Sequence, residues 1–162
     1  MTDNFDMGDS AVESGIESHE RLRACLLAAR ENGRPELILD FIPYSGFIGA
    51  KAKLDEGDVL YWLEPRRSNI GNPSLPALHG GVIAGFLELS ASVELLFGLE
   101  LNSMPKVVDF SLDYLRPGRL QTLYASCKVL RQGKQLVNIS ITAWQVDIEL
   151  PVATARCHFL IN

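Results

Sequence analysis

The spacing of apolar residues predicts a helix in the first part of the chain. Over residues 22–29, apolar side chains recur at i, i+3, i+4 and i+7, which is the period of a helix with one buried face. The preceding segment contains Ser-x-x-Glu, the form of a capping box, and Asn32-Gly33 ends the pattern. We therefore expect an amphipathic helix over residues 15–32.

A longer apolar segment, residues 81–97, predicts a second helix. It is apolar on nearly all sides, so the rest of the fold must enclose it. Glu88 stands in its middle, and the residues one helical turn away are all small: Ala84, Gly85, Ala91 and Ser92. An acid on such a stripe leaves room for a ligand or another backbone to approach, although a carboxylate that simply faces solvent would fit the same pattern.

Strand patterns lie on both sides of this helix. Before it, residues 47–54 and 59–63 flank the turn signal Asp-Glu-Gly-Asp, and the three prolines of residues 64–77 predict a loop. After it, four segments predict strands joined by short links: residues 107–114, 120–130, 136–146 and 152–161. We expect these four strands to be antiparallel neighbours in chain order.

These elements predict an α+β domain in which an antiparallel sheet wraps around a long central helix, with an extra N-terminal helix. The length of 162 residues and the 47% hydrophobic content suit one domain with a real core. We expect an acidic flexible N-terminus over residues 1–14, an N-terminal helix and linker over 15–45, and the main domain over 46–162.

Charge and cysteine content narrow the class of protein. The net charge is −5, and the first 20 residues hold no Lys or Arg, so nothing favours a nucleic-acid partner. Three cysteines without C-x-x-C spacing, and no signal-peptide pattern, favour a reduced, cytoplasmic protein. The apolar run at residues 82–97 is interrupted by polar residues and is too short for a bilayer span, so we expect no membrane partner.

The start of the helix over residues 81–97 offers a second candidate for chemistry. Gly80 and Gly81 stand there, where a helix presents unpaired N–H groups at the positive end of its dipole. Glycine lets a ligand carbonyl approach these groups. Fixed N–H donors can stabilise an oxyanion, and Glu88, two turns along, could act as a base or a nucleophile.

These motifs resemble the hotdog-fold thioesterases, in particular the phenylacetate-pathway (PaaI-like) group. The resemblance rests on Asn72-x6-His79-Gly80-Gly81-x6-Glu88, on Asp113-Tyr114-Leu115-Arg116-Pro117, and on Arg131-Gln132-Gly133-Lys134. It covers residues 46–161 and implies a hotdog fold. It also implies hydrolysis of acyl-CoA or a related acyl thioester without a metal or organic cofactor. The expected assembly is a homodimer or a dimer of dimers, with active sites between subunits.

The resemblance implies a role for each site residue. Glu88 is expected to be the general base for water, or the nucleophile, and the Gly80 N–H is expected to polarise the thioester carbonyl. His79 would fix the loop and contact the substrate, and Asn72 would position the water or the thioester. Further substrate contacts are expected from Gly81 and from three basic residues that could meet the phosphates of coenzyme A: Arg116, Arg131 and Lys134. Ordinary solvated turns would also account for these three charges.

Two positions depart from the family pattern. The family usually carries Asn or Gln six residues before the His, where this chain has Pro73, and often Ser or Thr where this chain has Val107. These departures support an alternative, a catalytically weak or inactive hotdog subunit that binds acyl thioesters or pairs with an active paralogue. A related dehydratase is a third possibility, but such enzymes use a His on the corresponding segment together with a distant acid.

Overall fold

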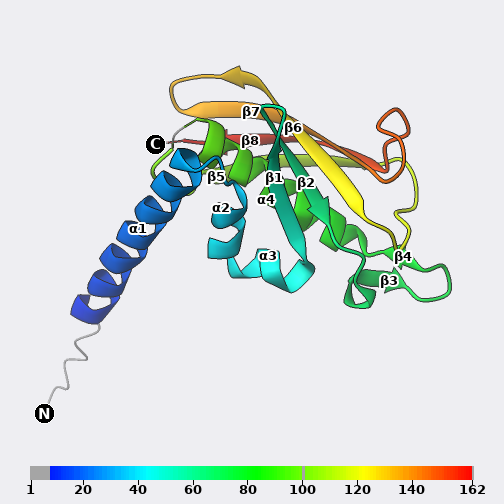
Figure 1. Ribbon diagram of the computed structural model, residues 1–162, viewed down its shortest axis with the longest axis horizontal. Helices are drawn as coiled ribbons and strands as arrows, with labels where there is room; N and C mark the ends of the chain where they lie inside the picture. The colour runs from blue at the N-terminus through cyan, green and yellow to red at the C-terminus, as the bar shows by residue number, and fades with distance from the viewer. Residues whose placement is uncertain (1–7, 100, 162) are drawn as a thin grey trace, which may run out of the picture.

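The computed structural model describes residues 8–99 and 101–161, with side chains from residue 17 onwards. Three helices precede the first strand: α1 (Gly8–Glu31), α2 (Glu36–Phe41) and α3 (Pro43–Ile48). The long helix α4 (Gly80–Gly98) lies beneath an antiparallel sheet, with α2 and α3 packed against it (Figure 1). The predicted α+β architecture, with a sheet around a central helix and an extra N-terminal helix, is confirmed.

The main sheet has six strands in the order β1-β2-β6-β7-β8-β5. Their bounds are β1 (Ala50–Asp55), β2 (Asp58–Leu63), β5 (Lys106–Tyr114), β6 (Leu123–Gln132), β7 (Leu136–Trp144) and β8 (Ala153–Leu160). The expectation that the last four strands are neighbours in chain order is wrong for β5. This strand pairs with β8, because β2 already occupies the free edge of β6. The segment predicted as a loop contains the short helix η1 (Arg67–Asn69) and a small sheet of β3 (Ile70–Asn72) and β4 (Ala77–Leu78).

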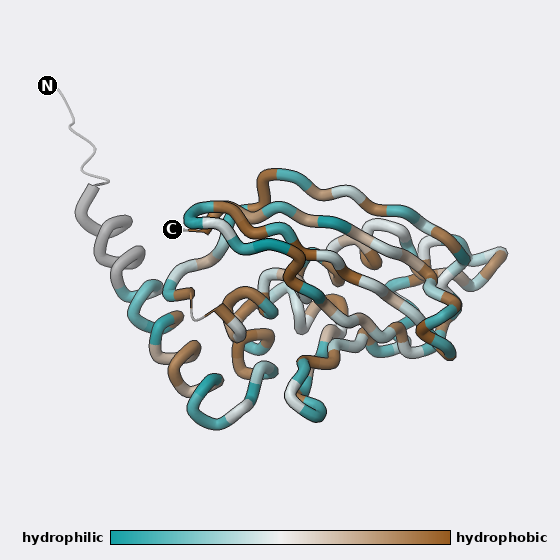
Figure 2. The backbone as a smooth tube through the Cα atoms, turned by 90° about the horizontal axis from the view of Figure 1, so that it is seen from above, coloured by the Kyte–Doolittle hydropathy of each residue, from teal (hydrophilic) through white to brown (hydrophobic). Residues whose placement is uncertain are grey.

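The core lies between the sheet and α4. Alternate residues of β7 are buried against it, and the alternation of hydropathy along the strands is visible in Figure 2. Helix α4 is buried over most of its circumference. By length and composition this helix could cross a membrane, whereas the sequence pattern was expected to be too short and too polar. No other helix in the described residues meets this criterion. The burial of α4 identifies it as the central core helix.

The N-terminal region differs from its prediction. Helix α1 begins at Gly8 rather than at residue 15, so part of the segment expected to be flexible is helical, while residues 1–7 lie outside the described residues. Phe47 belongs to α3, and β1 starts at Ala50 instead of residue 47. Pro43 favours the start of α3, and Gly49, with φ of 83°, ends it in the left-handed conformation that favours glycine.

The C-terminal half of α1 docks onto the domain, while its N-terminal half points away from the sheet (Figure 1). Leu22, Leu26 and Ala29 are buried in the core cluster. Arg30 donates from Nη2 to the carbonyls of Leu96 at 2.5 Å and Leu101 at 2.6 Å. Because Leu96 belongs to the last turn of α4, the guanidinium lies at the negative end of that helix and ties α1 to it.

Candidate functional site

His79 caps the N-terminus of α4. Its backbone is extended, and its Nδ1 accepts a hydrogen bond from the Gly81 N–H at 2.9 Å. The backbone N–H of His79 donates to the carbonyl of Asn69 at 2.8 Å, which holds the cap in place. The cap therefore uses the Gly81 amide. Gly80, at the first helical position, has no carbonyl in the preceding turn to bind its own N–H.

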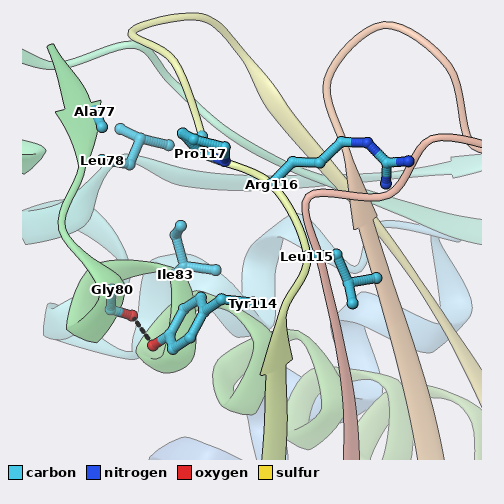
Figure 3. A pocket seen from close by; sticks show the side chains of 9 residues that line it. Ala77, Leu78, Gly80, Ile83, Tyr114, Leu115, Arg116 and Pro117 are labelled. Carbon is cyan, nitrogen blue, oxygen red and sulfur yellow. Dashed lines mark hydrogen bonds between the residues drawn. The ribbon is translucent and has the colours of Figure 1, made fainter. Parts of the chain in front are cut away.

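Tyr114 links the two motifs of the site. Its hydroxyl donates to the carbonyl oxygen of Gly80 at 2.7 Å (Figure 3). A Cβ at Gly80 would lie 2.9 Å from that hydroxyl oxygen, so only glycine fits without displacing the ring. This hydrogen bond, made from the end of β5, fixes the orientation of the Gly80–Gly81 peptide. The sequence showed Tyr114 only as part of a motif, since nothing in it indicates that the end of β5 meets the start of α4.

A cavity of about 290 Å³ opens beside this contact. Its walls come from β4, from the start of α4 and from the segment after β5: Ala77, Leu78, Gly80, Ile83, Tyr114, Leu115, Arg116, Pro117 and Gly118 (Figure 3). Most of these side chains are apolar. A carbonyl group entering here would therefore find the Gly80 segment at the edge of an apolar recess.

Asn72 shapes the loop before the cap. Its Oδ1 accepts from the backbone N–H groups of Ser74 at 3.0 Å and Leu75 at 3.2 Å, so its side chain closes a turn that contains Pro73. A residue that the sequence analysis missed, Asn69, is buried and donates from Nδ2 to the Ile48 carbonyl at 2.7 Å. In the sequence, Asn69 is simply a polar residue in a proline-rich segment, and such a position does not predict burial.

Glu88 lines a separate cavity of about 390 Å³ with Ile42, Tyr44, Gly85, Leu89, Ser92 and Met104. The carboxylate is exposed to this space, and no donor in the described residues is bonded to it. The small residue Gly85 is approached by the hydroxyl end of Tyr44 from α3. A Cβ at Gly85 would lie 3.0 Å from the Tyr44 ring. The stripe of small residues therefore admits a close neighbour, and at Gly85 this neighbour is a side chain of α3 rather than the ligand or backbone that the sequence predicts.

Gly80 and Glu88 do not meet within one chain. They are eight residues apart on a continuous helix, which corresponds to about 12 Å along its axis. They also line different cavities. The Gly80 N–H and the Glu88 carboxylate of a single chain are therefore too far apart to act on the same carbonyl group.

The three predicted basic contacts do not cluster. Arg116 donates from Nη1 to the Pro151 carbonyl at 2.8 Å and lies beside the Gly80 cavity. Arg131 and Lys134 stand at the turn between β6 and β7, at the end of the sheet where Lys106 begins β5. The nine residues of β5 separate the two ends by roughly 25–30 Å. Only Arg116 is placed near the start of α4.

A second acid on α4, Glu94, is partly buried. The Tyr61 hydroxyl, itself in the core, donates to its Oε2 at 2.8 Å. Burial raises the pKa of Glu94, the hydrogen bond from Tyr61 opposes that shift, and the charge of Asp58 adds to it. The sequence analysis gave Glu94 no role, because a second acid on the helix looked like an ordinary polar interruption.

The core cysteines are not activated nucleophiles. Burial, with the charges of Glu88 and Asp109, raises the pKa of the Cys157 thiol to about 12. Burial also raises the pKa of Cys127, with a further contribution from Glu94. A thiolate is the reactive form of cysteine, so both thiols are inert at neutral pH.

The sequence matches a known family over this site. The Thioesterase superfamily profile matches residues 75–152, from β4 to the start of β8. Over 106 residues the chain is 30% identical to the medium/long-chain acyl-CoA thioesterase YigI of Salmonella typhimurium, covering 57% of this chain and 68% of that protein. The Escherichia coli K12 protein of the same name matches with the same identity and coverage.

Solved structures show the same fold. A protein of Chromobacterium violaceum is 42% identical, with a TM-score of 0.71 over 85% of this chain and 96% of that chain. A putative thioesterase of Ralstonia eutropha, described as phenylacetic acid degradation-related, shares the fold at 18% identity, with a TM-score of 0.64 over 74% of this chain and 90% of that chain. The resemblance to hotdog-fold thioesterases is thus confirmed, and the chain belongs to the thioesterase superfamily of thioester hydrolases.

Proposed function

We propose that the protein is an acyl-CoA thioesterase in which the Gly80 N–H stabilises the oxyanion and Glu88 acts as general base or nucleophile. The observation that carries this proposal is the fixed start of α4. The His79 carbonyl, which shares a peptide unit with the Gly80 N–H, accepts from the N–H groups of Val82 at 2.9 Å and Ile83 at 3.1 Å, so the Gly80 N–H has a fixed direction before any substrate binds. The next peptide unit is held as well, by the His79 cap on the Gly81 N–H and by the Tyr114 bond to the Gly80 carbonyl. A preorganised donor of this kind stabilises the negative charge that develops on a thioester carbonyl oxygen.

The reaction needs water and no redox step. Water adds to the thioester carbonyl while the Glu88 carboxylate takes its proton, or the carboxylate adds first and water then cleaves the resulting anhydride. The C–S bond breaks, and the sulfur leaves as free coenzyme A after taking up a proton. Asn72 contributes by shaping the loop that leads to His79 and, in this proposal, by positioning the water or the thioester.

The site is assembled from two copies of the chain. Gly80 and Glu88 of one chain are about 12 Å apart along α4, beyond the reach of a base acting directly or through one water. A second copy related by a two-fold axis can bring its Gly80 to the first copy's Glu88, and this arrangement creates two equivalent sites. The assembly we propose is therefore a homodimer, alone or paired into a dimer of dimers.

The edge strand β5 is the surface for this pairing. It ends the sheet beside β8 and carries exposed apolar residues, including Val108 at 56% exposure. The opposite edge, β1, is shorter and carries Lys51 and Lys53, which discourage pairing with another sheet. The nine-residue β5 also carries charged residues, Lys106, Asp109 and Asp113, but it offers a longer edge and more exposed apolar side chains for addition of a second β5 than the six-residue β1 does. Val107, a departure from the family pattern, would then lie at the interface.

The direct test is free-thiol release from acyl-CoAs with short, medium, long and aromatic acyl groups. The medium/long-chain relatives lead us to expect the fastest release from medium or long aliphatic chains. The Glu88→Gln variant serves as the control for thiol release that does not depend on the carboxylate. A folded protein that releases no thiol from any substrate would refute the proposed hydrolysis. It would favour the alternative of a binding subunit or an inactive partner, which Pro73 and Val107 support.

A mixing experiment tests the two-chain site. Glu88→Gln removes the carboxylate. Gly80→Pro removes the N–H at a helical position whose backbone accepts proline, and its Cβ also displaces the Tyr114 hydroxyl, so this variant disables the oxyanion half of the site. Each variant alone should be inactive. Random mixed dimers should regain about a quarter of the wild-type activity, because half of them are hybrids and each hybrid has one intact site. Failure to regain activity, with hybrid dimers demonstrated by mass spectrometry, would contradict a site shared between chains.

The proposed location is the cytoplasm. Cys25, Cys127 and Cys157 are all free, and burial raises the pKa of each thiol. Free thiols are typical of a reducing compartment.

A further inference from the structure

A second cavity lies next to the Glu88 cavity. It has a volume of about 510 Å³ and is lined by residues of α1, by Phe41 of α2 and by the segment that leads into β5. Met104 lines both cavities, and two consecutive residues, Phe41 and Ile42, line one cavity each. The two spaces are therefore neighbours, and Met104 is the side chain that they share.

The second cavity is built largely from parts of the chain outside the superfamily match. His19 and Leu22 come from α1 and Phe41 from α2, all before residue 75, where the match begins. Helix α1 keeps its place there because Leu22 is buried and Arg30 binds the end of α4. The N-terminal helices thus add a hollow to the superfamily core, on the side of α4 that carries Glu88.

The lining of this hollow favours an aliphatic occupant. Leu22, Phe41 and Met104 supply its apolar walls, and the remaining lining residues are polar: Ser18, His19, Ser103 and Lys106. Three of these four, Ser18, His19 and Lys106, are exposed, whereas Leu22 is buried, and Lys106 is the one lysine or arginine among them. A single lysine is a poor match for the several phosphates of coenzyme A, which call for a cluster of donors. Together the two cavities reach the upper part of the roughly 300–1,000 Å³ range of small-molecule sites, whereas the Glu88 cavity alone is near its lower end.

We propose that the acyl tail of the substrate passes Met104 from the Glu88 cavity into the cavity under α1, so that Met104 and the N-terminal helices set the acyl-chain length. This inference rests on the proposed function and names the part of the chain that selects its substrate. Methionine suits a divider between two spaces, because its unbranched side chain can adopt several shapes. Met104 is also 42% exposed, so it is not locked by the core.

The expected gain follows from burial of methylene groups. Each methylene moved from water into the second cavity should raise kcat/KM by about fourfold, the equivalent of its transfer free energy. Filling that cavity with a larger side chain should remove this gain for long chains more than for short ones. The measured quantity is thus the ratio of kcat/KM between a long and a short substrate, which cancels general losses of activity.

The test compares three tryptophan variants on butanoyl-, octanoyl-, dodecanoyl- and hexadecanoyl-CoA. Met104→Trp blocks the passage, and His19→Trp fills the far cavity from an exposed position on α1. Leu54→Trp, at 41% exposure on the β1–β2 hairpin, is the control for an added indole. We expect the dodecanoyl-to-butanoyl ratio to fall at least about tenfold in the first two variants and to stay unchanged in the control.

A binding measurement separates this inference from the proposed hydrolysis. Calorimetric titration of the same acyl-CoAs into Glu88→Gln protein, alone and combined with Met104→Trp or with His19→Trp, measures affinity without turnover. Affinity that rises with chain length and loses this rise in Met104→Trp supports the inference, even for a protein that hydrolyses nothing. Affinity that is independent of chain length, or a length dependence that both Met104→Trp and His19→Trp leave intact, overturns it. Circular dichroism and thermal unfolding of each variant confirm that it is folded.

Discussion

Helix α4 carries two glutamates whose surroundings are opposite. Glu88 is exposed and lines a cavity, and no donor in the described residues reaches its carboxylate. Glu94, less than two turns further on, is partly buried and accepts a hydrogen bond from the core hydroxyl of Tyr61. An acid with its partner inside the fold is held in place by the protein, whereas an acid that faces a cavity is available to a substrate.

An apolar helix can therefore contain an acid in two ways, either buried with a hydrogen-bond donor or exposed to solvent. A carboxylate removed from water must be satisfied by a donor or lose its charge, and Tyr61 provides that donor for Glu94. Glu88 needs no internal donor, because it remains in contact with solvent. The position of an acid within an apolar sequence therefore does not indicate burial. The acid taken out of water here is not the one in the middle of the apolar run.

The largest expected difference lies in catalysis. Glu88→Gln should lower kcat by at least about a hundredfold, since a positioned general base contributes 10²–10⁴. Glu94→Gln should leave kcat within about twofold, because its side chain points to Tyr61. Steady-state hydrolysis of the best acyl-CoA substrate measures both. Equal losses in the two variants would show that the helix, and not the individual carboxylate, determines the rate.

For Glu88→Gln, the free energy of unfolding serves as the control. An exposed side chain without bonded partners should change it by no more than about 0.5 kcal/mol. Urea unfolding of the purified variant gives the value. A loss of several kcal/mol would mean that the lowered rate reflects misfolding, and the assignment of Glu88 would then lack support.

Two tyrosine hydroxyls extend the same comparison. Tyr114→Phe removes the hydrogen bond to the Gly80 carbonyl, and we expect kcat to fall about tenfold, less than the loss of an oxyanion donor itself. KM should change little, because the hydroxyl does not touch the substrate and acts by holding the Gly80–Gly81 peptide, which adjoins the peptide that carries the Gly80 N–H. Tyr61→Phe removes the bond to Glu94 and should lower the free energy of unfolding by about 1–2 kcal/mol, with kcat unchanged.

The two measurements, kcat and unfolding free energy, are made on both variants. Tyr124→Phe is a suitable control, since its ring stacks on Trp144 and its two chain neighbours, Leu123 and Ala125, are buried, which puts Tyr124 on the face of the sheet opposite to α4. Two results would contradict the roles assigned to these hydroxyls. One is a lower kcat for Tyr61→Phe, and the other is a lower free energy of unfolding without a change in kcat for Tyr114→Phe.

Much of the fold could be predicted because its signals are local. The period of the apolar residues located α4 and the strands, and the caps placed the end of α1. The position of β5 beside β8 could not be predicted, because strand order depends on pairing between distant segments. The error at Phe47 has a local cause. Its aromatic side chain favours a strand, but the flanking Pro43 and Gly49 produce a short helix.

Some features of the candidate site could likewise be predicted from local sequence, and others could not. The identity of Glu88, Gly80 and His79 came from the motif and its resemblance to a family, and the cap at His79 follows from its place before a helix. The separation of Arg116 from Arg131 could not be predicted, because a basic residue carries no sign of which end of a sheet it occupies. The roles of Asn69 and Tyr61 also depend on contacts between segments far apart in sequence.

The smallest expected effect is a change in the pH dependence of stability. Because burial raises the pKa of Glu94 above its ordinary 4.5, the folded protein holds a proton that the unfolded chain releases. The free energy of unfolding should therefore fall as the pH rises from about 4.5 through the raised pKa, with a slope of at most about 1.4 kcal/mol per pH unit for one proton. Glu94→Gln removes this proton uptake but keeps an acceptor for Tyr61, so its unfolding free energy should lack that decline. Asp58→Asn should narrow the pH range over which the free energy of unfolding declines, since the charge of Asp58 contributes to the raised pKa of Glu94. Urea unfolding of the three proteins between pH 4 and 8 measures these differences. Parallel curves for wild type and Glu94→Gln would mean that Glu94 is hydrated like Glu88, and the contrast between the two acids would then rest on the Tyr61 bond alone.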